Sequence, residues 1–163
     1  MTNQPDVHDR PNGNCFELGD VTQTRGSRTV LTNLSVNLPE GELIALIGPS
    51  GAGKTSLLRL LNRLDDPTSG EVRFRGNPLS AYSVRSIRRR IGFVFQAPTM
   101  FPGTVADNLL TAHSLGRNRN ESMADGRTHE VLRLVELDDD YSSRNSSELS
   151  GGEKQRVALA RAL

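Results

Sequence analysis

A chain of 163 residues can form one domain with a hydrophobic core, and 20 Lys and Arg against 19 Asp and Glu give a net charge of +1. Such a balance lacks the excess of positive charge expected of a general nucleic-acid binder. A single cysteine, Cys15, excludes an internal disulfide framework, the three histidines lack the spacing of zinc ligands, and no apolar run approaches the roughly 20 residues that span a bilayer.

The predicted elements fall into two regions of different character. Residues 1–14 are polar and include two prolines, so we expect a disordered tail there. Residues 15–96 mix strands with a helix, whereas residues 97–163 are mainly helical, which predicts an α/β core followed by a helical subdomain. The expected strands are 16–21, 30–38, 43–47, 71–75 and 91–95. The expected helices are 56–64, 104–110, 123–137 and 151–163, with a polar loop at 118–121.

A glycine-rich loop follows the apolar run 43–47, which has the composition of a strand buried on both faces. The loop matches G-x-x-x-x-G-K-[ST], and a leucine-rich helix follows it. Its glycines allow backbone N–H groups to point at phosphate oxygens, and the helix adds its positive N-terminal end. Lys54 would reach the β- and γ-phosphates, and Thr55 would offer its hydroxyl to Mg²⁺. The predicted nucleotide contacts in this loop are Gly48, Pro49, Ser50, Gly51, Ala52, Gly53, Lys54, Thr55 and Ser56.

A second glycine element stands near the end of the sequence. Ser150 and Glu153 have the spacing of a capping box, so the simplest interpretation is an ordinary helix start. A capping box does not need Gly151 and Gly152, and each glycine in a first helical turn costs roughly 1 kcal/mol relative to alanine. Glycines at these positions favour a bare helix N-terminus that an anion approaches closely.

In these motifs the sequence resembles the ATP-binding-cassette (ABC) ATPase family. The segment 149–163 is similar to that family's signature segment, Phe95-Gln96 to its Q-loop, and residues 64–72 to the stretch after its P-loop helix. The similarity extends over residues 16–163, with matching order and spacing. It implies an α/β fold of the P-loop NTPase class, with an N-terminal antiparallel β region and an α-helical subdomain.

The resemblance also implies an assembly and its ligands. Two subunits would form a head-to-tail homodimer or pseudo-dimer that sandwiches two ATP molecules, each with Mg²⁺. Gln96 would contact Mg²⁺ and the attacking water, so that Thr55 and Gln96 are the predicted metal ligands. The flanking loop 97–103 would touch a transmembrane permease subunit, which places the chain in the cytoplasm, peripheral on the inner face of the membrane, with no nucleic acid as partner. The predicted contacts to the ATP of the partner subunit are Ser150, Gly151, Gly152 and Glu153.

Two departures from the family pattern matter. The family usually stacks an aromatic residue on adenine at the place where this chain has Arg25, whose planar guanidinium can stack on a purine; an ordinary surface position would explain Arg25 equally well. The family's Walker B strand, catalytic glutamate and switch histidine lie beyond the signature helix, and the sequence stops at Leu163 before them. We therefore expect an incomplete central sheet, no catalytic base among these residues, and no ATP turnover by the 163 residues alone.

The sequence leaves open which transporter subtype the chain belongs to and whether it is a transport ATPase at all. Residues 96–109, with a Q-x-P-x-x-F stretch followed by Asp-Asn, resemble the phosphate-importer ATPases and also a group of metal-export ATPases. ABC ATPases of DNA repair insert coiled coil between the P-loop and the signature, but here Lys54 and Ser150 are separated by only 150 − 54 = 96 positions, without heptads. Two further alternatives also stay open: the chain belongs to the family's translation-factor branch, or it is an inactive fragment.

Overall fold

The computed structural model describes residues 13–116 and 125–163, and the side chains of residues 112–126 are not described. The chain divides into two compact units, Met1–Ile91 and Gly92–Leu163. Most of the predicted tail and the predicted loop 118–121 lie outside the described residues. Each unit has its own hydrophobic core, and the two are described separately.

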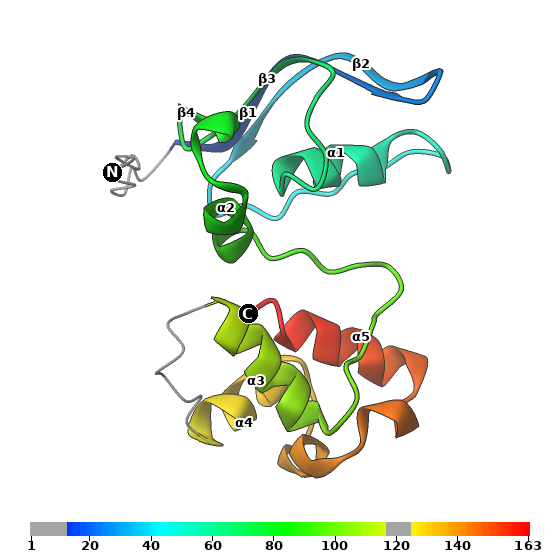
Figure 1. Cartoon of the computed structure of the whole chain (residues 1–163), viewed down its shortest axis with the longest axis vertical. Helices are drawn as coiled ribbons and strands as arrows, with labels where there is room; N and C mark the ends of the chain where they lie inside the picture. The colour runs from blue at the N-terminus through cyan, green and yellow to red at the C-terminus, as the bar shows by residue number, and fades with distance from the viewer. Residues whose placement is uncertain (1–12, 117–124) are drawn as a thin grey trace. The chain divides into compact units, whose positions relative to one another are not determined.

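The first unit is built on a four-stranded antiparallel sheet with the strand order β2-β1-β3-β4 (Figure 1). β1 lies inside the sheet, where Phe16 pairs with Leu38 of β2 on one side and with Phe74 of β3 on the other. The predicted antiparallel β region is thereby confirmed. The strands are β1 (Asn14–Arg25), β2 (Arg28–Pro39), β3 (Ser69–Phe74) and β4 (Asn77–Pro78).

Helix α1 (Lys54–Leu61) supplies the leucines that cover this sheet. Leu57, Leu60 and Leu61 are buried while Leu58 is exposed, which is the one-sided pattern of an amphipathic helix. The 3₁₀ turn η1 (Leu79–Ala81) and the short helix α2 (Val84–Arg90) complete the unit. The buried core consists of Phe16, Leu18, Val21, Leu57, Leu60, Leu61, Val72, Phe74, Leu79, Tyr82 and Ile87.

Two of the five expected strands are absent from this structure. Residues 43–47 make no strand and are exposed, Leu43 and Ile47 almost completely. Residues 91–95 also lack strand structure, and Phe93 and Phe95 instead pack edge to face with ring centroids 4.8 Å apart. A strand buried on both faces needs hydrogen-bonded neighbours and covering layers, and among the described residues only β1 to β4 form a sheet. Both strand predictions are wrong, whereas the expectation of an incomplete central sheet agrees with the structure.

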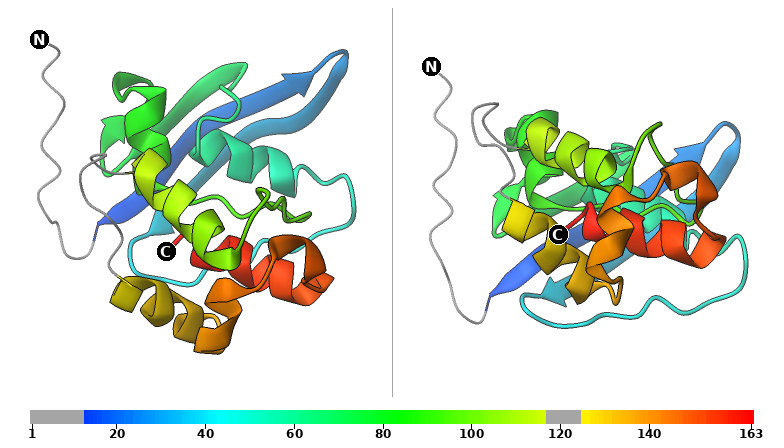
Figure 2. Two further views of the ribbon diagram at one scale, coloured as in Figure 1. Left: turned by 60° about the horizontal axis from the view of Figure 1, so that its bottom comes forward. Right: turned by 90° about the horizontal axis from the view of Figure 1, so that it is seen from below.

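The second unit is helical, as predicted. Its helices α3 (Val105–Gly116), α4 (Asp125–Leu134) and α5 (Gly151–Ala160) lie together in both views of Figure 2. Two 3₁₀ turns, η2 (Asp139–Ser143) and η3 (Ser146–Glu148), connect α4 to α5. None of the helices in the two described stretches is long and apolar enough to cross a membrane. The core of this unit consists of Val105, Leu109, Val131, Leu132, Val135, Leu137, Leu149, Val157 and Ala160.

Candidate nucleotide-binding site

The glycine-rich loop closes at Gly53, directly before α1. Gly51 and Gly53 have φ angles of 81° and 86°, in the left-handed region that side chains disfavour. A Cβ atom on Gly53 would lie 2.6 Å from the carbonyl oxygen of Val30 in β2, so the loop packs against the sheet backbone at this point. The first turn of α1 contains no acidic residue. Its positive N-terminal end is therefore not neutralised by a carboxylate of that turn.

Lys54 is folded back into the loop. Its Nζ donates hydrogen bonds to the carbonyl oxygens of Gly48, at 2.7 Å, and Pro49, at 2.8 Å. Both partners are neutral, and a phosphate oxygen is a stronger partner for an ammonium group because the hydrogen bond is then charge-assisted on both sides. The neighbouring Thr55 is exposed at the helix start, whereas Ser56 is buried. The predicted phosphate-binding residues are thus brought together around the N-terminus of α1.

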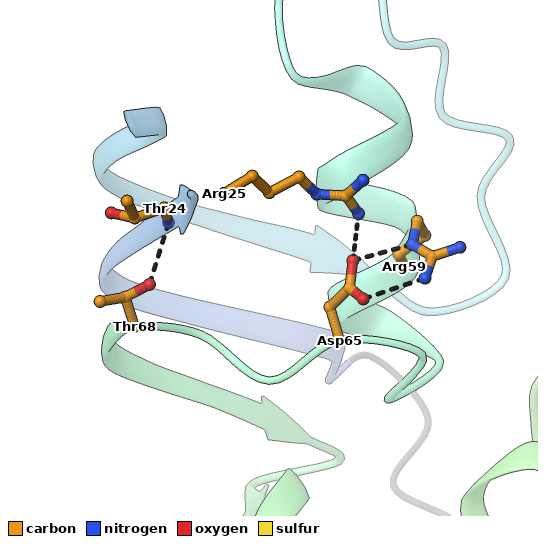
Figure 3. A network of polar contacts seen from close by, with 5 residues as sticks. All are labelled: Thr24, Arg25, Arg59, Asp65 and Thr68. Carbon is orange, nitrogen blue, oxygen red and sulfur yellow. Dashed lines mark hydrogen bonds and ion pairs between the residues drawn. The ribbon is translucent and has the colours of Figure 1, made fainter. Parts of the chain in front are cut away.

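Arg25 is anchored by an acidic residue that follows α1 (Figure 3). Its guanidinium pairs with Asp65, whose carboxylate also accepts hydrogen bonds from Arg59 at 2.8 and 2.9 Å. The Arg59 hydrogen bonds, and then that of Arg25, hold the pKa of Asp65 below its ordinary value. About half of the Arg25 side chain is exposed. The sequence indicates Arg25 but not Asp65, because Asp65 lies 40 positions away and no local pattern links the two.

We expect Asp65→Asn to lower the free energy of unfolding by about 1 to 2 kcal/mol at pH 7, because two partly exposed arginines lose their charged partner. Since the pKa of Asp65 is depressed in the folded state, its stabilisation is complete above the ordinary carboxyl pKa and disappears as the pH falls through the depressed value. The difference between wild type and variant should therefore vanish in strong acid. Urea unfolding at pH 7 and at pH 2 to 3 measures it, with Asp66→Asn, at a largely exposed position, as the matched control.

Gln96 lies in the second unit, exposed, at a bend that begins an irregular segment. The loop that follows it is held by Asn108 of α3, whose side chain is fully buried. Asn108 Oδ1 accepts a hydrogen bond from the Phe101 amide at 2.8 Å, and its Nδ2 donates to the Phe101 and Thr104 carbonyl oxygens at 3.0 and 2.9 Å. Ser146 Oγ donates to the same Phe101 carbonyl oxygen at 2.8 Å. The loop after Gln96 is thus tied both to α3 and to the turn before the signature segment.

The signature segment begins α5 with the predicted capping box. Ser150 Oγ accepts a hydrogen bond from the Glu153 amide at 3.3 Å, and Glu153 Oε2 accepts one from the Ser150 amide at 2.7 Å. The other carboxylate oxygen of Glu153 accepts a hydrogen bond from the Tyr141 hydroxyl at 2.6 Å. These hydrogen bonds, with that of Tyr141 the largest cause, lower the pKa of Glu153 to about 2. No sequence motif indicates Tyr141, which lies in η2.

Gly151 and Gly152 are exposed in the first turn of α5. A Cβ atom added to either glycine would meet nothing within 4 Å, so packing inside the chain does not require glycine here. Both nevertheless lower helix propensity. The open space in front of the helix N-terminus agrees with an anion approaching from outside the chain.

The residues present fit a magnesium ion that arrives with a nucleotide. The described stretches contain no group of three or more His, Cys, Asp or Glu side chains able to hold a metal ion. The Thr55 hydroxyl and the Gln96 amide are hard oxygen donors, and Mg²⁺ at nucleotide sites takes its remaining ligands from phosphates and water. The two donors belong to different units. Each could supply one oxygen ligand of an octahedral set.

Comparison with known proteins assigns the family. A family model described as "ABC transporter" matches residues 31–163, and this chain belongs to that family of ATP-binding cassettes. The chain is 41% identical over 138 residues to "ABC transporter I family member 17" of Arabidopsis thaliana, covering 85% of this chain and 51% of the relative. It is 40% identical over 152 residues to the "Sulfate/thiosulfate import ATP-binding protein CysA" of Escherichia coli K12, covering 91% of this chain and 41% of the relative.

A solved structure of an ABC transporter cassette agrees with this family assignment. The chain superposes on the dimeric bacterial ABC transporter cassette MJ0796 with a TM-score of 0.80 and 33% identity, covering 91% of this chain and 68% of that one. The α/β class of the P-loop NTPases is therefore confirmed. The chain spans about half or less of the length of the two curated relatives.

Proposed function

We propose that this chain is the ATP-binding subunit of an ABC transporter, which couples ATP binding and hydrolysis to transport across a membrane. The observation that carries the proposal is the loop around Lys54, whose ammonium lies at the N-terminus of α1 with only neutral carbonyl partners in the hydrogen bonds described. A nucleotide triphosphate supplies the anionic partner that this arrangement lacks.

Within its own site the chain would hold ATP from several sides. Backbone N–H groups of residues 48–56 would surround the β- and γ-phosphates, and Lys54 would exchange its carbonyl partners for phosphate oxygens. Thr55 and Gln96 would contribute oxygen ligands to Mg²⁺, which when bound neutralises phosphate charge. Arg25, oriented by Asp65, would lay its guanidinium plane on the adenine ring.

The signature segment would serve the ATP of a second subunit. Ser150 and the amides of Gly151 and Gly152 form an open helix N-terminus suited to a γ-phosphate. Both carboxylate oxygens of Glu153 are already engaged, by Ser150 and by Tyr141. We therefore assign Glu153 to shaping this turn rather than to direct contact with the nucleotide.

The partners follow from the same proposal. A homodimer or pseudo-dimer of cassettes would bind ATP between the subunits, and the related cassette MJ0796 is described as dimeric. A transmembrane permease would contact residues 97–103, which Asn108 and Ser146 hold in place. The chain would then act at the inner face of the cell membrane.

Two transported substrates are candidates. The similarity of residues 96–109 to phosphate-importer ATPases favours inorganic phosphate, and the 40% identity to a protein named for sulfate and thiosulfate import favours sulfate. Uptake of radioactive phosphate and sulfate by cells with and without the gene distinguishes them.

Nucleotide binding is tested by the two lysines of the chain, Lys54 and Lys154. We expect Lys54→Ala to weaken binding of a fluorescent ATP analogue by about 10- to 100-fold, since one charge-assisted hydrogen bond contributes about 1.5 to 3 kcal/mol. Lys154→Ala, which removes the same charge in α5, should bind within about twofold of wild type. Equal affinities for the two variants would contradict the proposed site.

A further inference from the structure

We propose that Tyr141 is a positioning residue for the signature turn: its hydroxyl holds the Glu153 carboxylate so that Gly151 and Gly152 face the partner's nucleotide. This inference rests on the proposed function, because it concerns the segment assigned to ATP bound by a second subunit. Tyr141 itself touches no nucleotide in this arrangement. It acts through Glu153.

The two carboxylate oxygens of Glu153 accept hydrogen bonds from two different partners. Oε2 accepts the hydrogen bond of the Ser150 amide, which is the capping-box contact, and Oε1 accepts that of the Tyr141 hydroxyl. A carboxylate with only the first contact can rotate and tilt about its side-chain torsions, which have a broad energy minimum. The second contact removes that freedom. Since Ser150 is bound to Glu153 in both directions, fixing the carboxylate also fixes the start of α5.

Tyr141 also affects the negative charge that Glu153 places at the start of α5. Glu153 places a negative charge in the helix turn that would receive a γ-phosphate, and its pKa of about 2 keeps it ionised at neutral pH. The Tyr141 hydrogen bond draws part of that charge away from the helix N-terminus, and it raises the pKa of Tyr141 itself. Arg144 lies over the Tyr141 ring, 3.8 Å from its centroid, and pairs with Asp140 at 2.6 Å. Lys154 is turned toward the Ser147 carbonyl oxygen at 3.4 Å.

The remaining tyrosine of the chain supplies a matched control. Tyr82 is buried in the first unit, and its hydroxyl is 3.5 Å from the Phe74 carbonyl oxygen. Tyr141→Phe and Tyr82→Phe each remove one hydroxyl and keep the ring. Only the first should affect the signature turn.

The experiment uses the full-length gene product and three readouts: affinity for a fluorescent ATP analogue, self-association in Mg-ATP by analytical ultracentrifugation, and the Glu153 carboxyl pKa by NMR. We expect Tyr141→Phe to bind the analogue within about twofold of wild type. Its ATP-driven self-association should weaken roughly tenfold, the effect of losing one hydrogen bond to a charged group. The Glu153 pKa should rise from about 2 toward its ordinary value. Tyr82→Phe should leave self-association and the Glu153 pKa unchanged.

A double variant shows whether Tyr141 acts through Glu153. In a Glu153→Ala background, Tyr141→Phe should weaken self-association no further, because the acceptor is already gone. The inference is overturned if Tyr141→Phe associates like wild type, or if its defect is undiminished in that background. If wild type binds ATP but never self-associates, the proposed dimer fails and this inference fails with it. If Lys54→Ala leaves nucleotide binding intact, the proposed nucleotide site fails independently of Tyr141.

Discussion

Replacing Gly53 by alanine should destabilise the protein by about 3 kcal/mol and abolish nucleotide binding. Two effects add. The φ angle of 86° costs an L-residue roughly 1 to 2 kcal/mol, and the new Cβ would lie 2.6 Å from the Val30 carbonyl oxygen, an overpacking that costs about 1 to 3 kcal/mol. The Val30 oxygen is a backbone atom of β2, and its chain neighbours Thr29 and Leu31 are both paired with β1, which limits how far it can move.

Gly51→Ala provides the comparison within the same loop. Its φ angle of 81° is nearly the same, but the nearest atom to an added Cβ is the flexible tip of Arg28 at 4.0 Å. Only the backbone strain remains, so the expected loss is about 1 kcal/mol. Urea unfolding followed by circular dichroism, with titration of a fluorescent ATP analogue, measures both variants. Equal destabilisation by the two alanines would show that the loop does not pack on β2.

The local parts of the site were predictable from sequence. The P-loop and the capping box each lie within eight consecutive residues, and their chemistry depends on backbone conformation and near neighbours. The structure starts α5 at Gly151, as the pattern predicts, and starts α1 at Lys54, slightly before the expected helix 56–64. Residues 56–64 and 71–75 were likewise found by their periodicity, and residues 16–21 and 30–38 were found as extended stretches.

The non-local parts were not predictable. The apolar composition of 43–47 indicates burial on both faces, but a sequence pattern cannot supply the neighbouring strands that burial requires. Asp65 meets Arg25 across 40 positions, and Tyr141 meets Glu153 across 12. Each contact depends on how separate elements pack, and no spacing rule within one helix or strand encodes it. Asp65 and Tyr141 orient Arg25 and Glu153, the two residues that the sequence does indicate.

Asn108 is the second position where a large effect is expected. Asn108→Leu keeps the number and branching of the side-chain heavy atoms but removes three hydrogen bonds, and it leaves the Phe101 amide and the Thr104 carbonyl oxygen without this side-chain partner. Because the asparagine side chain is fully buried, the expected loss is about 3 kcal/mol in the free energy of unfolding.

Asn145→Ala, at an exposed asparagine of the same unit that accepts a hydrogen bond from Ser147, should lose at most about 1 kcal/mol. Faster amide exchange at residues 100–104 in Asn108→Leu alone would identify the loop after Gln96 as the part released. Unchanged exchange there, or equal unfolding midpoints for the two variants, would show that Asn108 does not hold this loop.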